Sequence, residues 1–161
     1  MNKRIEHIAW LTDQEFHGQS FNSKSLLITL ESLSMEQVTM TDTLEGYTVW
    51  EIALHVASWK WLLADILGGN PRPWPYQRED WPKLDTVPTK AVWEKIIDDL
   101  IATHHDYMKT LEGLSDEKLD EEHEEWKIPH WQFITWMSSH DVFHGAQIRN
   151  MGIGEIKYTS D

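Results

Sequence analysis

Apolar side chains recur at helical spacing over long stretches of this sequence, and no stretch shows the strict apolar–polar alternation of a half-buried β-strand. The clearest stretch begins at Thr48 and is ended by Gly68, where a Gly-Gly-Asn-Pro sequence cannot continue a helix. Thr48 and Glu51 have the spacing of a capping box, in which each side chain binds the backbone N–H of the other residue. The pattern therefore predicts an all-α fold.

The rest of the chain fits the same architecture. Helical spacing predicts further helices over residues 3–16, 23–33, 89–111 and 129–152. The proline- and tryptophan-rich segment 71–82 is expected to be a long connection that forms a lid or a pocket wall. The acidic segment 115–125 is expected to be a solvated, short helical connector. We predict a single domain over residues 1–161, folded as a four-helix bundle with a long crossover connection.

Composition excludes several classes of function. The chain carries 14 basic and 27 acidic residues, a net charge of −13 with neutral histidines, so we expect neither nucleic acid nor membrane as a partner. It has no cysteine, which excludes disulfides, thiolate nucleophiles and cysteine-based metal sites. No apolar run approaches the roughly 20 residues that span a bilayer, and no secretory signal is recognisable. We expect a cytoplasmic protein.

Three of the nine histidines are predicted to project toward a common interior. His140 and His144 are four residues apart and share a helical stripe with Phe133 and Met137, while His55 shares a stripe with Ile52 and Trp59. One divalent metal ion would satisfy three buried imidazoles and leave a position for water or substrate. The alternative is that each histidine is a core residue bonded to a backbone carbonyl. Asp141, not glutamate, follows His140, which argues against a zincin metalloprotease.

Other polar residues near these stripes have simpler explanations. His104 falls near an apolar stripe and is expected to contribute a polar group to the interior. Gln147 lies on the stripe of His144, where it would contact a bound ligand, orient a histidine or bond to a facing helix. Asp141 is expected to face solvent. The remaining histidines of terminal and connecting segments are expected at the surface or as capping residues, namely His7, His17, His123 and His130.

Two segments together resemble the DinB-like superfamily, a group of metal-binding four-helix bundles. They are YTVWEIALHVASW, from Tyr47 to Trp59, and HDVFHGAQI, from His140 to Ile148. The similarity extends over roughly residues 20–151 and includes the Asp-Trp-Pro sequence of the long connection. It implies that His55, His140 and His144 are the metal ligands. The family usually has glycine at the position of Ala146, a departure that bears on the pocket wall and leaves the ligands unchanged.

Three functions are compatible with such a site. A divalent metal, zinc first and nickel second, would hold a low-molecular-weight thiol as thiolate, as the resemblance implies for a metal-dependent transferase. The alternatives are a hydrolase that uses metal-bound hydroxide and a non-catalytic metal-binding stress or interaction protein. The expected partners are a small-molecule substrate and a second copy of the chain in a homodimer. Five tryptophans are expected either to line the pocket or to pack in the core, namely Trp50, Trp59, Trp74, Trp81 and Trp136.

Overall fold

The computed structural model describes residues 3–21, 23–42 and 44–158, and in this part of the chain the regular structure is entirely helical. Two isolated β-bridges accompany the helices. The described residues form seven helices, namely α1 (Lys3–Phe16), α2 (Leu26–Glu31), α3 (Met35–Val38), α4 (Val49–Ile66), α5 (Lys90–Glu112), α6 (Asp116–Asp120) and α7 (His130–Asn150). The predicted all-α fold is confirmed. None of the described helices has the length and apolar character needed to cross a membrane.

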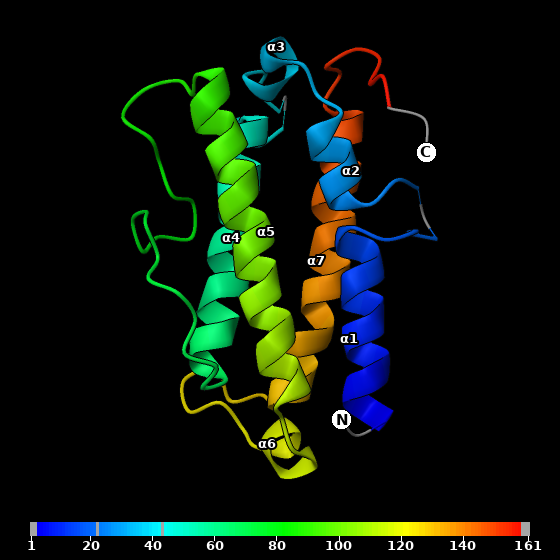
Figure 1. The fold of residues 1–161 in the computed structure, drawn as a ribbon, viewed down its shortest axis with the longest axis vertical. Helices are drawn as coiled ribbons and strands as arrows, with labels where there is room; N and C mark the ends of the chain where they lie inside the picture. Colours follow the sequence, from blue (N-terminus) through cyan, green and yellow to red (C-terminus); the bar gives the residue numbers. More distant parts are fainter. Residues whose placement is uncertain (1–2, 22, 43, 159–161) are drawn as a thin grey trace.

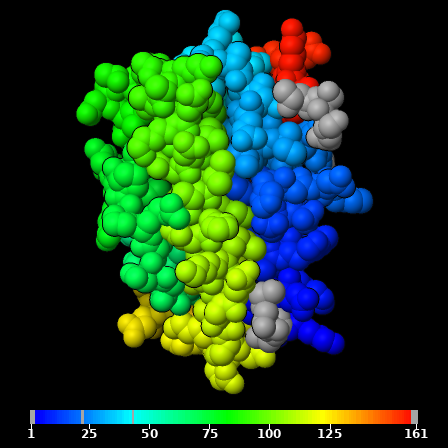
Figure 2. Space-filling model, viewed as in Figure 1, coloured from blue at the N-terminus to red at the C-terminus, as the bar shows by residue number. Residues whose placement is uncertain are grey.

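The four longest helices lie side by side along the length of the molecule (Figure 1). α5 packs against α4 and α1, and α7 packs against α1, α4 and α2. α4 and α5 run in the same direction, so the chain between them returns along the side of the molecule as a long connection without helix (Figure 1). Figure 2 shows α5 at the centre of one face, with α1 and α2 beside it.

Capping residues set the ends of the long helices. The hydroxyl of Thr48 accepts the N–H of Glu51 at 3.3 Å, and the carboxylate of Glu51 accepts the N–H of Thr48 at 2.8 Å. Beyond α4, Gly68 has a φ of +80°, a left-handed conformation that glycine adopts without strain. Thr89 caps α5. The predicted capping box and the predicted bounds of the long helices are thus confirmed to within about two residues.

The N-terminal half differs from prediction after residue 25. The helix expected over 23–33 is shorter, and a separate α3 follows it. Ser34 explains the break, because its hydroxyl accepts the N–H of Gln37 while the Gln37 side chain accepts the N–H of Ser34. This second capping box begins α3 just after the predicted end of the 23–33 helix, where no further helix was predicted.

Polar residues separate two apolar core clusters. Along α4 the first cluster uses residues 49–57 and the second uses 63–67, and Lys60 lies between them. Along α7 the interval between the clusters contains His140, Asp141 and His144. The middle of the molecule therefore holds a layer of buried polar groups, and this layer carries the candidate site.

One prediction of exposure is wrong. Asp141 is buried, because its carboxylate faces α4 and pairs there with Lys60, and α1 also packs against α7. His130 is buried at the start of α7 and takes the capping role, one of the two roles expected for it, since its Nδ1 lies 2.8 Å from the carbonyl oxygen of Lys118 in the last turn of α6. His17 is half exposed, as predicted.

Candidate metal centre

The three histidines singled out in the sequence converge in the structure. His55 comes from α4, and His140 and His144 come from successive turns of α7. Nε2 of His140 lies 3.0 Å from Nε2 of His55 and 3.1 Å from Nε2 of His144. All three rings offer one nitrogen to a common point, within 4.8 Å of one another. The helical-stripe argument therefore predicted this juxtaposition correctly.

Two of the rings are oriented by partners behind them. Nδ1 of His55 lies 2.6 Å from the carbonyl oxygen of Asp80, and Nδ1 of His144 lies 2.7 Å from Oε1 of Gln147. A carbonyl oxygen only accepts, so both Nδ1 atoms carry the proton and both Nε2 atoms present a lone pair. The Gln147 amide is itself fixed, because its NH₂ group donates to the Asp42 carboxylate at 2.7 Å. Gln147 thus orients His144, one of the roles considered for it.

The arrangement leaves His140 with a conflict that a cation would remove. Its Nε2 faces the lone pairs of both His55 and His144, but an N–H at this position can donate to one of them only. Its Nδ1 is buried without a hydrogen-bond partner among the described residues. Ligands about 2.0–2.1 Å from a tetrahedral zinc ion lie about 3.3 Å apart, close to the separations found here. The three residues therefore fit a divalent metal ion.

Electrostatics keeps the three rings neutral, the form in which imidazole binds a metal. Burial lowers the pKa of His55. Burial, followed by the neighbouring rings of His144 and His55, lowers the pKa of His140 to about 2. Burial and the ring of His55 lower the pKa of His144 to about 4. At neutral pH the cluster carries no charge of its own.

The long connection forms one wall of the site, as predicted. The Trp81 ring stacks on the His55 ring with centroids 3.9 Å apart, and Tyr47 stacks on Trp81 at 3.5 Å. The Asp80 carboxylate accepts the indole N–H of Trp59 at 2.6 Å. These contacts hold the connection against α4 and hold the His55 ring in one orientation.

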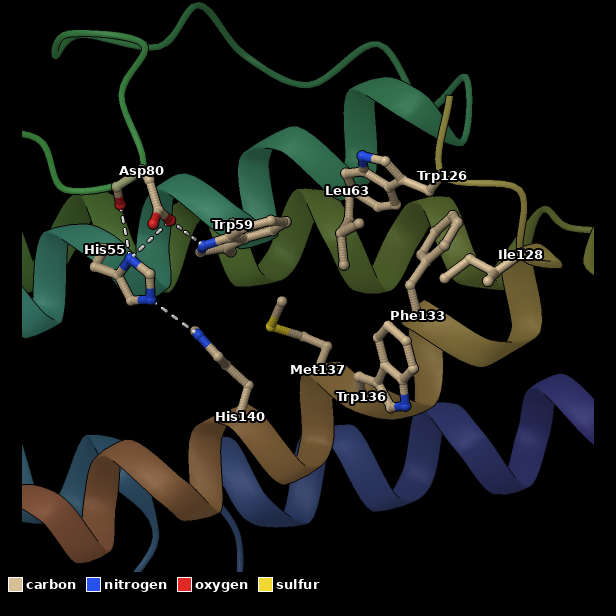
Figure 3. Close-up of a pocket in the computed structure, with 10 residues that line it drawn as sticks. All are labelled: His55, Trp59, Leu63, Asp80, Trp126, Ile128, Phe133, Trp136, Met137 and His140. Carbon is tan, nitrogen blue, oxygen red and sulfur yellow. Dashed lines mark hydrogen bonds and ion pairs between the residues drawn. The ribbon is translucent and has the colours of Figure 1, made fainter. Parts of the chain in front are cut away.

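A pocket of about 580 Å³ opens beside His55 and His140 (Figure 3). Trp59 and Trp136 are among its walls, whereas Trp50 belongs to the first core cluster and Trp74 packs against that cluster. The volume lies in the range of small-molecule sites. Its complete lining is His55, Trp59, Leu63, Asp80, Trp126, Ile128, Phe133, Trp136, Met137 and His140.

One residue of this site, Asp42, was not indicated by the sequence. Asp42 lies before α4 and anchors Gln147 across the molecule, and this hydrogen bond is the largest cause that lowers the pKa of the Asp42 carboxyl. Nothing in its local sequence distinguishes it from other acidic residues, because its role depends on the approach of α7. Glu51 serves the capping box, as expected.

A second group of possible ligands occurs between α1 and α5. His104 is buried and stacks on Phe16, as its stripe suggested, and its Nε2 lies 3.4 Å from the carboxylate of Asp13. His17 approaches the same carboxylate at 3.4 Å, and its side chain is 50% exposed. The first cluster has shorter separations and fixed ring orientations, so it is the stronger candidate.

Comparison with known proteins identifies one family. A family model described as the DinB superfamily matches residues 20–148, which include all three histidines of the cluster. No curated protein and no solved structure matches the chain.

Proposed function

The chain belongs to the DinB superfamily, and on that premise we propose that it holds one divalent metal ion on His55, His140 and His144 and acts as a transferase for a low-molecular-weight thiol. The observation that carries the proposal is the convergence of three Nε2 atoms on neutral rings, of which those of His55 and His144 are buried and that of His140 is partly buried. A divalent cation on three neutral ligands retains its full charge, so that it acts as a Lewis acid and lowers the pKa of a thiol or of water.

The residues around the cluster have separate tasks in this proposal. Gln147 and the Asp80 carbonyl fix the proton positions of His144 and His55, so that Nε2 of each ring points inward. Trp81 covers one face of His55 and keeps water from it. The pocket beside His55 and His140 gives a small molecule access to the site.

Two features favour a thiol as the nucleophile. The chain contains no cysteine, so a sulfur nucleophile would have to come from a cofactor. The three candidate ligands are also neutral, so a metal ion on them would keep its full positive charge for a bound thiolate. Zinc is the first candidate metal and nickel the second, because imidazole suits both.

A conjugation assay tests the proposal. Zinc-loaded protein is incubated with chlorodinitrobenzene and either cysteine or glutathione. In the reaction the sulfur forms a bond to the ring carbon, chloride leaves, and the thiol proton passes to the buffer. We expect a rate above the uncatalysed background that disappears in His144→Ala and persists in the control variant His17→Ala. A rate that is the same with and without metal would overturn the thiol transferase.

One observation favours a hydrolase as the second candidate. The Asp80 carboxylate lines the pocket beside His55 and is 58% exposed, so it can reach a water molecule. Asp80→Asn keeps an oxygen for the Trp59 N–H and leaves the main-chain carbonyl in place. A hydrolase that uses Asp80 as a base would lose about 100-fold or more of its ester or phosphoester turnover in this variant. Thiol conjugation would be little changed.

Absence of turnover in both assays, with metal bound, would support the non-catalytic alternative. The expected homodimer stays a prediction, and the exposed side chains of Trp10 and Phe143 are the apolar groups that a partner would cover.

A further inference from the structure

We propose that the pocket beside His55 and His140 binds the uncharged, aromatic part of the substrate that the thiol attacks. This inference rests on the proposed function for the reaction at one end of the substrate. It rests on the pocket walls for the chemical character of the group bound at the other end. It assigns a substrate class, a neutral arene or similarly flat apolar group, to a pocket of about 580 Å³.

The pocket has a polar end and an apolar end. His55, His140 and Asp80 lie together at one end, and Trp126 and Ile128 lie at the other (Figure 3). A molecule that fills the pocket would therefore place one end near the histidines and the remainder among apolar side chains. Between the ends the walls are Trp59, Leu63, Phe133, Trp136 and Met137.

Charge restricts what the apolar end accepts. None of the ten residues that line the pocket is lysine or arginine, and the one carboxylate, on Asp80, lies at the polar end. A carboxylate or phosphate at the apolar end would lose its hydrating water without gaining a hydrogen-bonding or ionic partner, which opposes its binding. The net charge of −13 opposes anions further. The group bound at this end is therefore uncharged.

The aromatic walls favour a flat ring. Trp126 meets Phe133 edge to face, with centroids 5.3 Å apart and an angle of 87°, and meets Trp59 at 6.0 Å. Such offset and edge contacts are the arrangements that aromatic rings prefer. Trp136, although it lines the pocket, is 53% exposed. A ligand ring in the pocket would cover this indole and gain its contact area.

A second hollow shows that this character is specific to one pocket. It lies between α1 and α5 and has a volume of about 780 Å³. Its walls include Glu6, Lys109 and Glu112 together with Asp13 and His17. A neutral arene there would contact charged groups of both signs, so we expect no comparable selectivity.

Two fluorescent probes with the same arene separate charge from size. Phenylnaphthylamine is neutral, and anilinonaphthalene sulfonate adds one negative charge to it. Both are titrated into metal-free protein, prepared with a chelator, because a bound cation would attract the sulfonate. We expect saturable binding of the neutral probe at one site per chain and binding of the sulfonate at least about tenfold weaker.

Variants locate the binding site. Trp136→Ala should weaken the neutral probe about fivefold or more, because it removes a half-exposed wall. Trp131→Ala, on the same helix but outside the pocket lining, should leave the affinity unchanged. Ile128→Arg places a cation at the apolar end and should strengthen binding of the sulfonate. This gain of binding needs a folded pocket, so it does not depend on interpreting a loss.

Equal affinity for the two probes would overturn the inference, as would equal losses in Trp136→Ala and Trp131→Ala. Failure of the metal proposal would give a different experimental result. A chain that binds the neutral probe selectively but takes up no metal would refute the proposed function and leave the pocket assignment standing.

Discussion

The buried ion pair between Lys60 and Asp141 provides a strong test of how the central layer is stabilised. The ammonium of Lys60 donates to the Asp141 carboxylate at 2.6 Å, and both side chains are fully buried. Burial lowers the pKa of Lys60 and raises the pKa of Asp141, and in both residues the charge of the partner opposes the shift. Removal of one partner leaves an unpaired charge at a fully buried position.

We predict that Lys60→Met lowers the free energy of unfolding by about 3–5 kcal/mol, the usual cost of breaking a buried pair. The double variant Lys60→Met/Asp141→Leu replaces both charges by apolar groups of similar size. Its free energy of unfolding should lie within about 1 kcal/mol of the wild type or above it, because no buried charge remains to be desolvated.

The measurement is urea denaturation of the metal-free protein at neutral pH, followed by circular dichroism, for the wild type, both single variants and the double variant. A loss below about 1 kcal/mol in Lys60→Met would refute the argument, since that is the scale of an exposed pair. A double variant as unstable as the sum of the single variants would refute it as well, because the two charges would then be acting independently.

Three further predictions concern the site and its supports. Burial lowers the pKa of His144 to about 4 in the folded chain, so as the pH falls below about 6.5 the unfolded chain takes up a proton at this ring before the folded chain does. The free energy of unfolding of the metal-free protein should therefore fall by about 1.4 kcal/mol per pH unit for each such ring. A urea midpoint that stays unchanged between about pH 6.5 and 5 would contradict this prediction. Trp81→Ala uncovers His55 and should weaken zinc binding about tenfold in competition with a chromogenic chelator; an unchanged affinity would exclude a supporting role. Thr48→Ala removes the capping box of α4 and should cost about 1 kcal/mol in urea denaturation; a loss below the experimental error would show that the cap contributes nothing.

Local signals in the sequence were sufficient for the four long helices and for the three histidines. Thr48 and Gly68 mark the ends of α4 by side-chain and backbone chemistry that needs no tertiary context. The faces of His55, His140 and His144 follow from helical periodicity, and the rings meet because α4 and α7 pack against each other.

Features that depend on long-range packing could not be predicted in the same way. Asp141 was expected in solvent because one buried face was assumed for α7, but α4 and α1 both pack against α7, and Asp141 pairs with Lys60 of α4, whose ammonium lies 4.8 Å from the ring centroid of Phe16 in α1. The Asp80 carbonyl that orients His55 is a backbone atom of an irregular connection, and side-chain patterns carry no information about its direction. Asp42 acquires its role only when α7 brings Gln147 to it.

Elemental analysis of the untagged protein, purified without added metal, tests the central claim most directly. We predict about one equivalent of a divalent transition metal per chain in the wild type and in His17→Ala, and almost none in His55→Ala, His140→Ala or His144→Ala. Loss of the metal in His17→Ala, with the metal retained in the three other variants, would contradict this prediction. A wild-type protein that is purified without metal and takes up no zinc when it is dialysed against a zinc solution would contradict it as well.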